Sequence, residues 1–416
     1  MPPRRRRTGG QPEENFRLAQ EIERVQRAAR RRARNPFELR VTGPWEQGEG
    51  YHYMFKENDL LVSDADLRRV EEALDRRGVE HHVADALIGG VTLLEVSGVD
   101  VVQLLDDLDG ELGIGVVTPN HVLDVQPSGG GVCPATEPEP ATVEERWPVA
   151  ADPALGRGVR VAVVDTGFLP RYNRNRSLPW LRGVDRFDVD DDAFLPDGDI
   201  APYGAHGTFS AGVVLSVAPA ATVSVDDVLL GGVVDEATIV RQLADALADS
   251  PDVISLSAGT YTRHNVPPKA LTAFYEHRLR HHKGIAVVAA AGNNMTRQPF
   301  WPAAFPWALA VGSLTRDGQQ RSAFSNYGGW VDVYAPGEEI VNAFANGRYT
   351  YLDGRVGEFT DRMARWSGTS FATPLVAGLV ARRMALTGEN GQEAVESLKR
   401  LAQLTFLPGV GPRLLP

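Results

Sequence analysis

The stretch SGTSFATPLVAG, from Ser367 to Gly378, carries the most information in this chain of 416 residues. Gly368 and Thr369 precede Ser370, so the backbone can turn tightly there and come close to a bound molecule. Pro374 and the apolar run that follows it predict a buried helix beginning near this serine. A serine at a helix N-terminus lies beside unpaired backbone N–H groups, which stabilise negative charge. Taken alone, such a segment is better interpreted as an ordinary Ser/Thr helix cap before a core helix.

Two further segments supply the groups that a serine nucleophile needs. VRVAVVDTGF, from Val159 to Phe168, predicts a buried parallel strand with Asp165 at its C-terminal end. YGAHGTFSAG places His206 before small residues that open a helix, unlike most of the other histidines, which lie in polar stretches. Serine needs a base to take its proton, histidine titrates in the right range, and a buried carboxylate orients the imidazole. The evidence from each segment is weak alone, because Asp165 also fits a structural or metal-binding role and His206 also fits a turn residue.

The blocks VAVVDTGF, HGTFSAG and SGTSFATPLVAG, in this order, resemble those of the subtilisin-like serine peptidases, or subtilases. GIAVVAAAGNN, from Gly284 to Asn294, and VISLSAGT, from Val253 to Thr260, agree with the same family. The resemblance extends from Trp147 to Leu407. It implies an α/β fold with a doubly wound, mostly parallel sheet.

The resemblance also implies a serine endopeptidase that cleaves protein or peptide substrates through an acyl-enzyme intermediate. It places the catalytic triad at Asp165, His206 and Ser370, and the amide that stabilises the oxyanion at Asn293. A plain turn is the alternative for Asn293, because Asn and Gly often share turns. The expected substrate-binding residues are Ser257, Ala258, Gly259, Ala291, Gly292 and Phe300. This pocket would favour a small or medium apolar side chain, whereas an acidic rim would instead recruit basic substrates.

We expect no cofactor and no metal. The chain between His206 and Val217 is too short for the loop that wraps calcium in many subtilases. Several acidic residues between Asp165 and His206 offer carboxylates to a hard cation, but a solvated acidic loop is the favoured interpretation. These residues are Asp188, Asp190, Asp191, Asp192, Asp197 and Asp199.

The composition of the chain indicates how many domains it can form and in which cellular compartment it is expected. With 43% hydrophobic residues, a chain of this length can form more than one domain. Its single cysteine, Cys133, excludes a disulfide within the chain, and no apolar run follows the N-terminal arginines to make a signal peptide. No apolar stretch reaches the roughly 18 residues of a membrane span. We therefore expect a cytoplasmic bacterial protein without a membrane partner.

Residues 1–40 form an Arg-rich arm, with 12 Arg against 5 Asp and Glu in a chain whose net charge is −11. Residues 14–34 predict a helix with few apolar positions. A solvated, partly disordered helix is the favoured interpretation. Binding of nucleic acid through residues 1–40 is the less favoured one, because no aromatic interleaving accompanies the charge.

Residues 41–126 predict a small α+β domain with the ferredoxin-like order β-α-β-β-α-β. Its first helix is expected to be capped by Ser63 or Asp64 and to end at Gly78. Subtilase propeptides have a similar order, with their sheet against two helices of the catalytic domain and their C-terminal tail in the cleft. The position of this domain therefore predicts a propeptide-like intramolecular inhibitor, which makes the chain a zymogen. A permanently attached accessory domain is the alternative.

Residues 127–146 are rich in Gly, Pro and Glu and predict a linker before the catalytic domain, residues 147–416. Maturation would cut in this linker or at the last strand before it. Residues 347–366 predict a surface hairpin that narrows the cleft, or a loop without function. A different class of function is a permanently inhibited or inactive scaffold with a subtilase fold. Four intact site residues argue against lost chemistry but leave permanent inhibition open.

Overall fold

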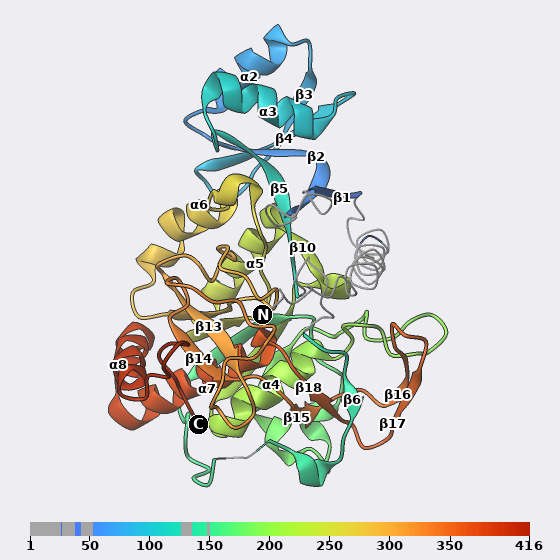
Figure 1. Cartoon of the computed structure of the whole chain (residues 1–416), viewed down its shortest axis with the longest axis vertical. Coiled ribbons are helices and arrows are strands. Elements are labelled where there is room, and N and C mark those ends of the chain that lie inside the picture. Colours follow the sequence, from blue (N-terminus) through green and yellow to red (C-terminus); the bar gives the residue numbers. More distant parts are fainter. Residues whose placement is uncertain (1–25, 27–37, 43–52, 126–134, 148–149) are drawn as a thin grey trace, which may run out of the picture.

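The computed structural model describes residue 26 and residues 38–42, 53–125, 135–147 and 150–416 (Figure 1). Almost all of the predicted arm lies outside this part of the chain, as does Cys133. The described residues form two units. The N-terminal unit comprises residues 38–42 and 53–125, and the larger unit comprises residues 135–147 and 150–416.

A seven-stranded, entirely parallel sheet forms the centre of the larger unit, in the order β14-β13-β12-β11-β7-β9-β8. Its central strands are buried along their whole length, as expected for parallel strands covered on both faces. The predicted doubly wound α/β architecture is thus confirmed. The strands are β7 (Arg160–Asp165), β8 (Val184–Phe187), β9 (Thr222–Asp227), β11 (Val253–Leu256), β12 (Ala286–Ala290), β13 (Ala308–Leu314) and β14 (Val333–Pro336).

Helices cover both faces of this sheet. Alternate residues of β7 point to opposite sides, so that Val161 and Val163 pack with α4 (His206–Val217) and α7 (Thr369–Thr387). Ala162 and Val164 pack on the other side, with α5 (Glu236–Ala248) and α6 (Lys269–His277). A further helix, α8 (Gly391–Leu404), packs against α7. Short 3-10 turns are η1 (Val143–Glu145), η2 (Tyr172–Arg174), η3 (Pro179–Gly183), η4 (Leu230–Gly232), η5 (Arg263–Asn265) and η6 (Leu279–His281).

The two helices that begin with His206 and Thr369 cross very closely. A Cβ on Gly378 of α7 would lie 2.2 Å from a methyl carbon of Val217 in α4. Glycine is therefore required at this crossing, and the close approach fixes α4 and α7 relative to each other.

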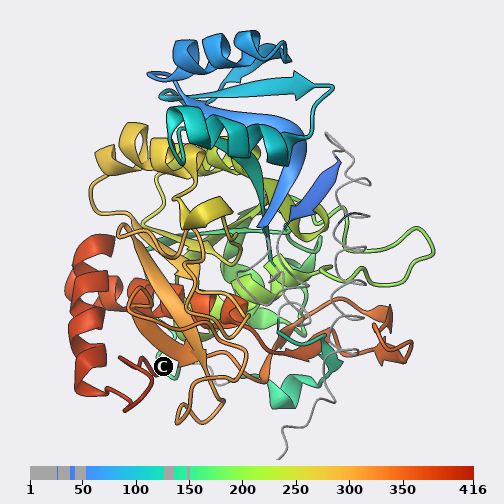
Figure 2. The same ribbon diagram turned by 45° about the horizontal axis from the view of Figure 1, so that its top comes forward.

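In the N-terminal unit, a four-stranded antiparallel sheet has the order β5-β2-β4-β3, and a fifth strand, β1, pairs with β2. One face is covered by the two helices α2 and α3, whose Leu74 and Leu105 pack with Leu60 and Leu94. The other face lies against α5 and α6 of the larger unit (Figures 1 and 2). The elements are β1 (Leu39–Thr42), β2 (Tyr53–Ser63), α2 (Leu67–Arg76), β3 (Glu80–Ala86), β4 (Val91–Ser97), α3 (Val101–Leu112) and β5 (Val117–Asp124).

Two local predictions were wrong in this unit. Leu39 and Arg40, assigned to the arm, belong to β1, where Arg40 forms ion pairs with Glu57 and Asp100. Helix α2 begins at Leu67 rather than just after Ser63 or Asp64. The reason is that Asp64 accepts hydrogen bonds from the Gly90 N–H and the Thr92 hydroxyl, so its carboxylate ties a turn instead of capping the helix.

The second half of the predicted linker is folded onto the larger unit. β6 (Glu139–Pro140) pairs with β18 (Met363–Trp366), which also pairs with β15 (Ile340–Ala343). The predicted hairpin is formed by β16 (Gly347–Thr350) and β17 (Val356–Phe359), and its Tyr349 hydroxyl donates to Glu137, 3.0 Å away. Composition could not reveal this, because a proline-containing edge strand has the composition of a linker.

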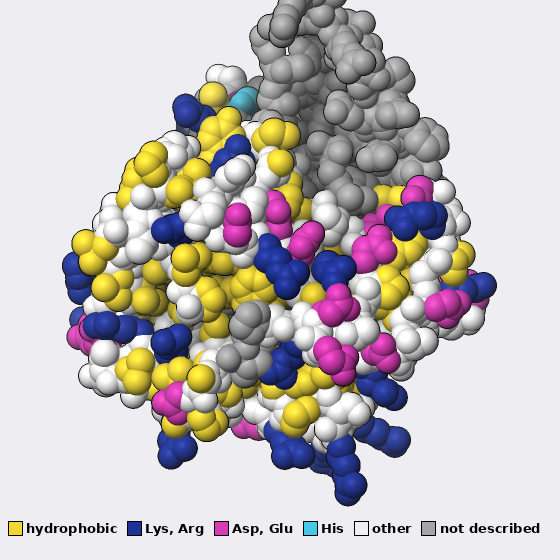
Figure 3. Space-filling view, turned by 60° about the horizontal axis from the view of Figure 1, so that its bottom comes forward, with side chains coloured by type: hydrophobic (Ala, Val, Ile, Leu, Met, Phe, Trp, Pro, Cys, Tyr) yellow, Lys and Arg dark blue, Asp and Glu magenta, His cyan; other side chains and the backbone are white. Residues whose placement is uncertain are grey.

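On the face that Figure 3 shows, acidic and basic side chains lie beside one another and among hydrophobic ones. In the described part of the chain, no helix combines the length and the apolar character needed to cross a bilayer.

Candidate active site

Asp165 and His206 meet at the C-terminal edge of the parallel sheet. Asp165 is the last residue of β7 and His206 the first of α4, and neither side chain is exposed. His206 Nδ1 lies 2.6 Å from Asp165 Oδ1, which also accepts the Thr166 N–H at 2.8 Å. A proton on Nδ1 leaves Nε2 as the basic nitrogen of the ring. The predicted acid and base are therefore brought together.

Aromatic side chains fix the plane of the His206 ring. The Trp366 ring meets it edge-on with centroids 5.5 Å apart, and the Phe371 ring lies at 5.2 Å. Trp366 and Phe371 lie on either side of Ser370 in the sequence, so the same two rings support His206 and the start of α7. Among the described residues, His206 Nε2 has no hydrogen-bond partner.

Ser370 lies in the first turn of α7, and only 1% of it is exposed. Its hydroxyl makes a long contact of 3.5 Å with the Ser257 carbonyl, in place of a hydrogen bond to His206. Hydrogen bonds between catalytic groups are often formed only when substrate is bound. Phe371, the residue after Ser370, packs against the His206 ring, while the Ser370 hydroxyl itself contacts Ser257.

The helix that carries Ser370 has an interrupted hydrogen-bond pattern. Pro374 lies four residues after Ser370 and has no N–H to donate to its carbonyl. The Ser257 hydroxyl donates to that carbonyl instead, at 2.9 Å. The predicted cleft residue Ser257 therefore fastens the end of β11 to the start of α7.

Asn293 is anchored by the residue that precedes the predicted nucleophile. Its Oδ1 accepts two hydrogen bonds of 2.8 Å, one from the Thr369 N–H and one from the Thr369 hydroxyl. Because both bonds use the oxygen, the donating end of the amide is its NH2 group. Thr369 also accepts the Gly292 N–H at 3.2 Å, which ties the Gly-Asn turn to α7.

Of the predicted pocket residues, Gly259, Gly292 and Phe300 lie together. A Cβ on Gly259 would come within 2.3 Å of the Phe300 ring, and one on Gly292 within 3.1 Å. Phe300 is buried at 3% exposure, so it forms a wall against two residues that have to be glycine. Ala258 and Ala291 contribute to the scaffold instead. Ala258 is part of the apolar core, and the Ala291 carbonyl accepts a hydrogen bond from the Asn326 side-chain amide.

The last strand of the N-terminal unit enters this region. Asp124 and Gly259 exchange two backbone hydrogen bonds of 3.0 Å each, and the Val125 N–H donates to the Gly232 carbonyl at 3.0 Å. β5 also pairs with β10 (Val233–Asp235). The buried side chains of Leu123 and Val125 belong to the same apolar cluster as Tyr203, Leu229, Val234 and Ala258.

Sequence reasoning missed the polar residues that join the two units. Asn120, within β5, donates to Asp59 and to Asp235 at 3.1 Å and accepts the Ala237 N–H at 3.0 Å. It thereby satisfies one N–H of the first turn of α5. A polar Asn-His pair inside an otherwise apolar strand was the available signal.

A buried pair of side chains lies next to it. His121 Nδ1 is 3.1 Å from Glu236 Oε2, and both side chains are almost completely buried. The other oxygen of Glu236 accepts the Ala270 N–H at the start of α6, at 2.6 Å. The Arg263 N–H donates to His121 Nε2 at 3.3 Å, so every polar atom of this pair has a partner.

The prediction of a solvated acidic loop was wrong for two of its residues. Asp190 is 6% exposed and Asp199 is 7% exposed, and Asp199 forms an ion pair of 2.7 Å with Arg348. Burial raises the pKa of Asp190 well above its usual range, and Asp227, Asp165 and Asp192 raise it further. Within the described ranges, no group of three or more His, Cys, Asp or Glu residues could hold a metal ion.

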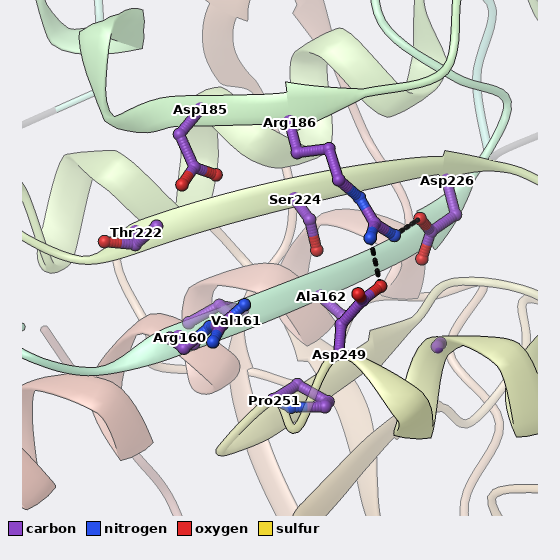
Figure 4. Close-up of a pocket in the computed structure, with 11 residues that line it drawn as sticks. Arg160, Val161, Ala162, Asp185, Arg186, Thr222, Ser224, Asp226, Asp249 and Pro251 are labelled. Atoms are coloured by element: carbon purple, nitrogen blue, oxygen red, sulfur yellow. Dashed lines mark hydrogen bonds and ion pairs between the residues drawn. The ribbon is translucent and has the colours of Figure 1, made fainter.

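A pocket of about 140 Å³ lies at the opposite end of β7 from Asp165 (Figure 4). Arg186 reaches across it to Asp226 at 3.2 Å and to Asp249. Burial raises the pKa of Asp226, and Arg186 opposes this shift. These contacts form an ion-pair cluster that joins β8, β9 and the end of α5, and we assign it no catalytic role.

Comparison with known proteins places this arrangement in a family. Residues 156–406 match the model of the subtilase family. The chain is 31% identical over 256 residues to the thermophilic serine proteinase of Bacillus sp. (strain AK1), covering 59% of this chain and 56% of that protein. It is 30% identical over 318 residues to the major intracellular serine protease of Bacillus subtilis (strain 168), covering 71% of this chain and 88% of that protein.

Thermitase of Thermoactinomyces vulgaris is 32% identical over 269 residues, which cover 61% of this chain and 85% of thermitase. The crystal structure of fervidolysin from Fervidobacterium pennivorans shares the fold, with a TM-score of 0.55 at 18% identity, covering 87% of this chain and 60% of that one. The chain spans only about half the length of the Bacillus AK1 relative, at 56%. On the strength of the family match over most of the larger unit, this chain belongs to the subtilase family of serine peptidases.

Proposed function

We propose that the chain is a serine endopeptidase with Asp165, His206 and Ser370 as its triad, and that its N-terminal unit holds it inactive. The observation that carries the proposal is the buried hydrogen bond of 2.6 Å between Asp165 and His206, whose imidazole packs against Phe371, the residue after Ser370. A buried carboxylate that orients an imidazole is what a serine needs for activation.

In the proposed reaction, His206 Nε2 takes the proton of the Ser370 hydroxyl as Oγ attacks the carbonyl carbon of a peptide bond. Asp165 keeps the Nδ1 proton in place and stabilises the imidazolium. His206 then protonates the leaving amine, and the C–N bond breaks to give an acyl-enzyme. Water, deprotonated by His206, attacks the ester, and Ser370 is restored.

Two donors stabilise the tetrahedral oxyanion in this proposal. The first is the Asn293 NH2 group, whose orientation is set by Thr369 through the amide oxygen. The second is the Ser370 N–H in the first turn of α7, where N–H groups have no partner within the helix. Donors fixed in advance cost no reorganisation during the reaction, which makes them effective in catalysis.

For the substrate we propose an extended peptide that adds a strand at Gly259 and Gly232. These are the backbone groups that β5 uses now, and strand addition supplies main-chain hydrogen bonds without regard to sequence. Side chains at alternate positions would enter the cluster that holds Leu123 and Val125, so apolar residues are favoured there.

The same contacts support inhibition by the N-terminal unit, residues 38–42 and 53–125 of the described chain. Its last strand uses the groups that an extended substrate would need, and its sheet lies on α5 and α6. A maturation cut in residues 127–146 would separate it from the catalytic domain, residues 147–416. Nucleic-acid binding by residues 1–40 and a cytoplasmic location stay predictions from the sequence.

Labelling by a fluorophosphonate, which reacts only with an activated serine, tests the proposal. We expect a single adduct that Ser370→Ala removes, and faster labelling when β5 is displaced by Val125→Asp. The competing function is a permanently inhibited or inactive scaffold. A chain that is never labelled, with or without Val125→Asp, would favour that scaffold.

A further inference from the structure

The backbone N–H groups of the two residues on either side of His206 are both held by hydrogen bonds. The Ala205 N–H donates to Asp190 Oδ2 at 2.7 Å, and the Gly207 N–H donates to the Thr166 hydroxyl oxygen at 3.1 Å. The Thr166 hydroxyl in turn donates to Asp190 Oδ2, at 3.4 Å. One carboxylate oxygen thus connects the residues before and after the base.

Thr166 also joins the hydrogen bonds of Asp190 to Asp165, the partner of His206. It directly follows Asp165, and its N–H donates to Asp165 Oδ1, the atom that contacts His206. The N–H of Thr166 therefore binds Asp165, and its hydroxyl binds the residue that follows His206. A shift of Thr166 would change the position of Asp165 and of the backbone at His206 together.

Ala205 has a backbone conformation that alanine rarely adopts. Its φ of 67° and ψ of 9° are in the left-handed region, where a side chain costs about 1 kcal/mol or more. Such a conformation persists only when its surroundings hold it. The short bond from the Ala205 N–H to Asp190 is a contact that does so, and this turn directs the His206 side chain.

The position of Asp190 is itself fixed. Its N–H donates to the Phe168 carbonyl at 3.2 Å, and a Cβ on Gly167 would come within 2.9 Å of its backbone nitrogen. The segment after β8 is therefore packed tightly against the loop after Asp165. Asp190 is 6% exposed, so its hydrogen bonds are shielded from water.

We propose that Asp190 is a positioning residue of the proposed peptidase reaction, holding the His206 backbone directly through Ala205 and indirectly through Thr166. The inference rests on the proposed triad. Asp190 itself touches neither the reacting atoms nor the substrate. Its contribution is to keep the imidazole on Asp165 and directed at Ser370.

Substitutions of Asp190 in the full-length chain that also carries Val125→Asp test this. Asp190→Ala removes the acceptor, and because small misplacements of a catalytic group cost up to about 10²-fold, we expect kcat to fall about 10- to 100-fold with KM unchanged. Asp190→Asn keeps an oxygen for the Ala205 N–H and should stay within about 3-fold of the parent. Asp191→Ala, at an exposed neighbour, is the matched control.

A proton NMR measurement separates positioning from general support of the fold. Because Nδ1 and Oδ1 are only 2.6 Å apart, we expect the proton between His206 and Asp165 to resonate far downfield. Asp190→Ala should shift or broaden this resonance, while Asp190→Asn and Asp191→Ala should leave it in place. Thr166→Val should lower kcat, as Asp190→Ala does, and Thr166→Ser should keep kcat close to that of the parent. These two variants decide the matter if Asp190→Ala does not fold.

Unchanged kcat and an unchanged downfield proton in Asp190→Ala would overturn the inference, as would an Asp190→Asn variant as impaired as Asp190→Ala. Failure of the proposed function looks different. In that case the parent chain shows no peptidase activity and no Ser370 adduct, whatever residue stands at position 190.

Discussion

Asp124 and Gly259 are joined by a reciprocal pair of backbone hydrogen bonds, each 3.0 Å long, across the boundary between the N-terminal unit and the larger unit. Gly259 ends the cleft segment that begins with Ser257, and the Ser257 hydroxyl binds the carbonyl of Ser370. The last strand of the N-terminal unit is thus connected to Ser370, the proposed nucleophile, through one short segment.

Displacing this strand should open the cleft. Leu123 is fully buried in an apolar cluster, so Leu123→Asp would bury an unpaired charge, whose cost is avoided only if β5 leaves. We expect fluorophosphonate labelling to become at least about 10-fold faster, because the free-energy cost of burying the charge shifts the equilibrium between bound and displaced β5 by more than about tenfold. Val83→Asp, at an exposed position of the same unit, should label like the parent. Equal rates for all three chains would contradict inhibition by β5.

Removing His121 should loosen the attachment of the N-terminal unit. His121→Ala leaves the Arg263 N–H and one Glu236 oxygen without their partner in a buried place, at about 1–3 kcal/mol for each orphaned group. Hydrogen–deuterium exchange should then speed up in β5 and at the starts of α5 and α6. His82→Ala, at an exposed ion pair with Glu95, is the control. Unaltered exchange in β5 would show that the buried pair does not hold the units together.

Asn293→Ala should reduce kcat by about 10²–10³-fold with little change in KM, because one donor to the oxyanion is lost. Thr369→Val, which removes the hydroxyl bond to the amide oxygen, should cost on the order of 10-fold, the worth of one net hydrogen bond. Thr369→Ser keeps the hydroxyl and should remain close to the parent. Steady-state kinetics on a peptide substrate measure all three, and a large rise of KM at constant kcat would assign Asn293 to ground-state binding instead.

The pH dependence of unfolding should report the buried carboxyl of Asp190. Burial raises its pKa in the folded chain above the ordinary value, so between the two values the unfolded chain is ionised while the folded chain holds the proton. This contribution to stability is present at low pH and is lost as the pH rises from about 4 through the raised pKa. Urea unfolding of the Ser370→Ala chain should show this fall in the free energy of unfolding as the pH rises. The chain that carries both Ser370→Ala and Asp190→Asn should not show it. Parallel curves for the two chains would contradict the raised pKa.

The parallel sheet and the location of the candidate site could be predicted from the sequence because both depend on local patterns. Apolar runs that end in Asp165 or precede Gly259 define buried strands, and strands of a parallel sheet bring their C-terminal ends to one edge. The small residues after His206 and Ser370 similarly indicated helices that pack closely. Asn293 could be predicted as part of the candidate site because its strand and turn are contiguous in the sequence.

The features that were missed depend on contacts between distant segments. Asp190 belongs to a run of acidic residues whose composition indicates solvent, and only its packing against the loop after Asp165 buries it. The folding of residues 135–146 onto β18 likewise depends on partners more than two hundred residues away, such as the Trp366 indole that donates to the Thr136 carbonyl. Periodicity carries no information about such pairings.

Intact-mass analysis of the full-length chain carrying Val125→Asp, after reaction with a fluorophosphonate, tests whether Ser370 is an activated nucleophile. We expect one adduct per chain, located on Ser370, absent in the same chain with Ser370→Ala and formed much more slowly with His206→Ala. An adduct that persists after Ser370→Ala, or a folded chain that acquires no adduct at all, would contradict this role of Ser370.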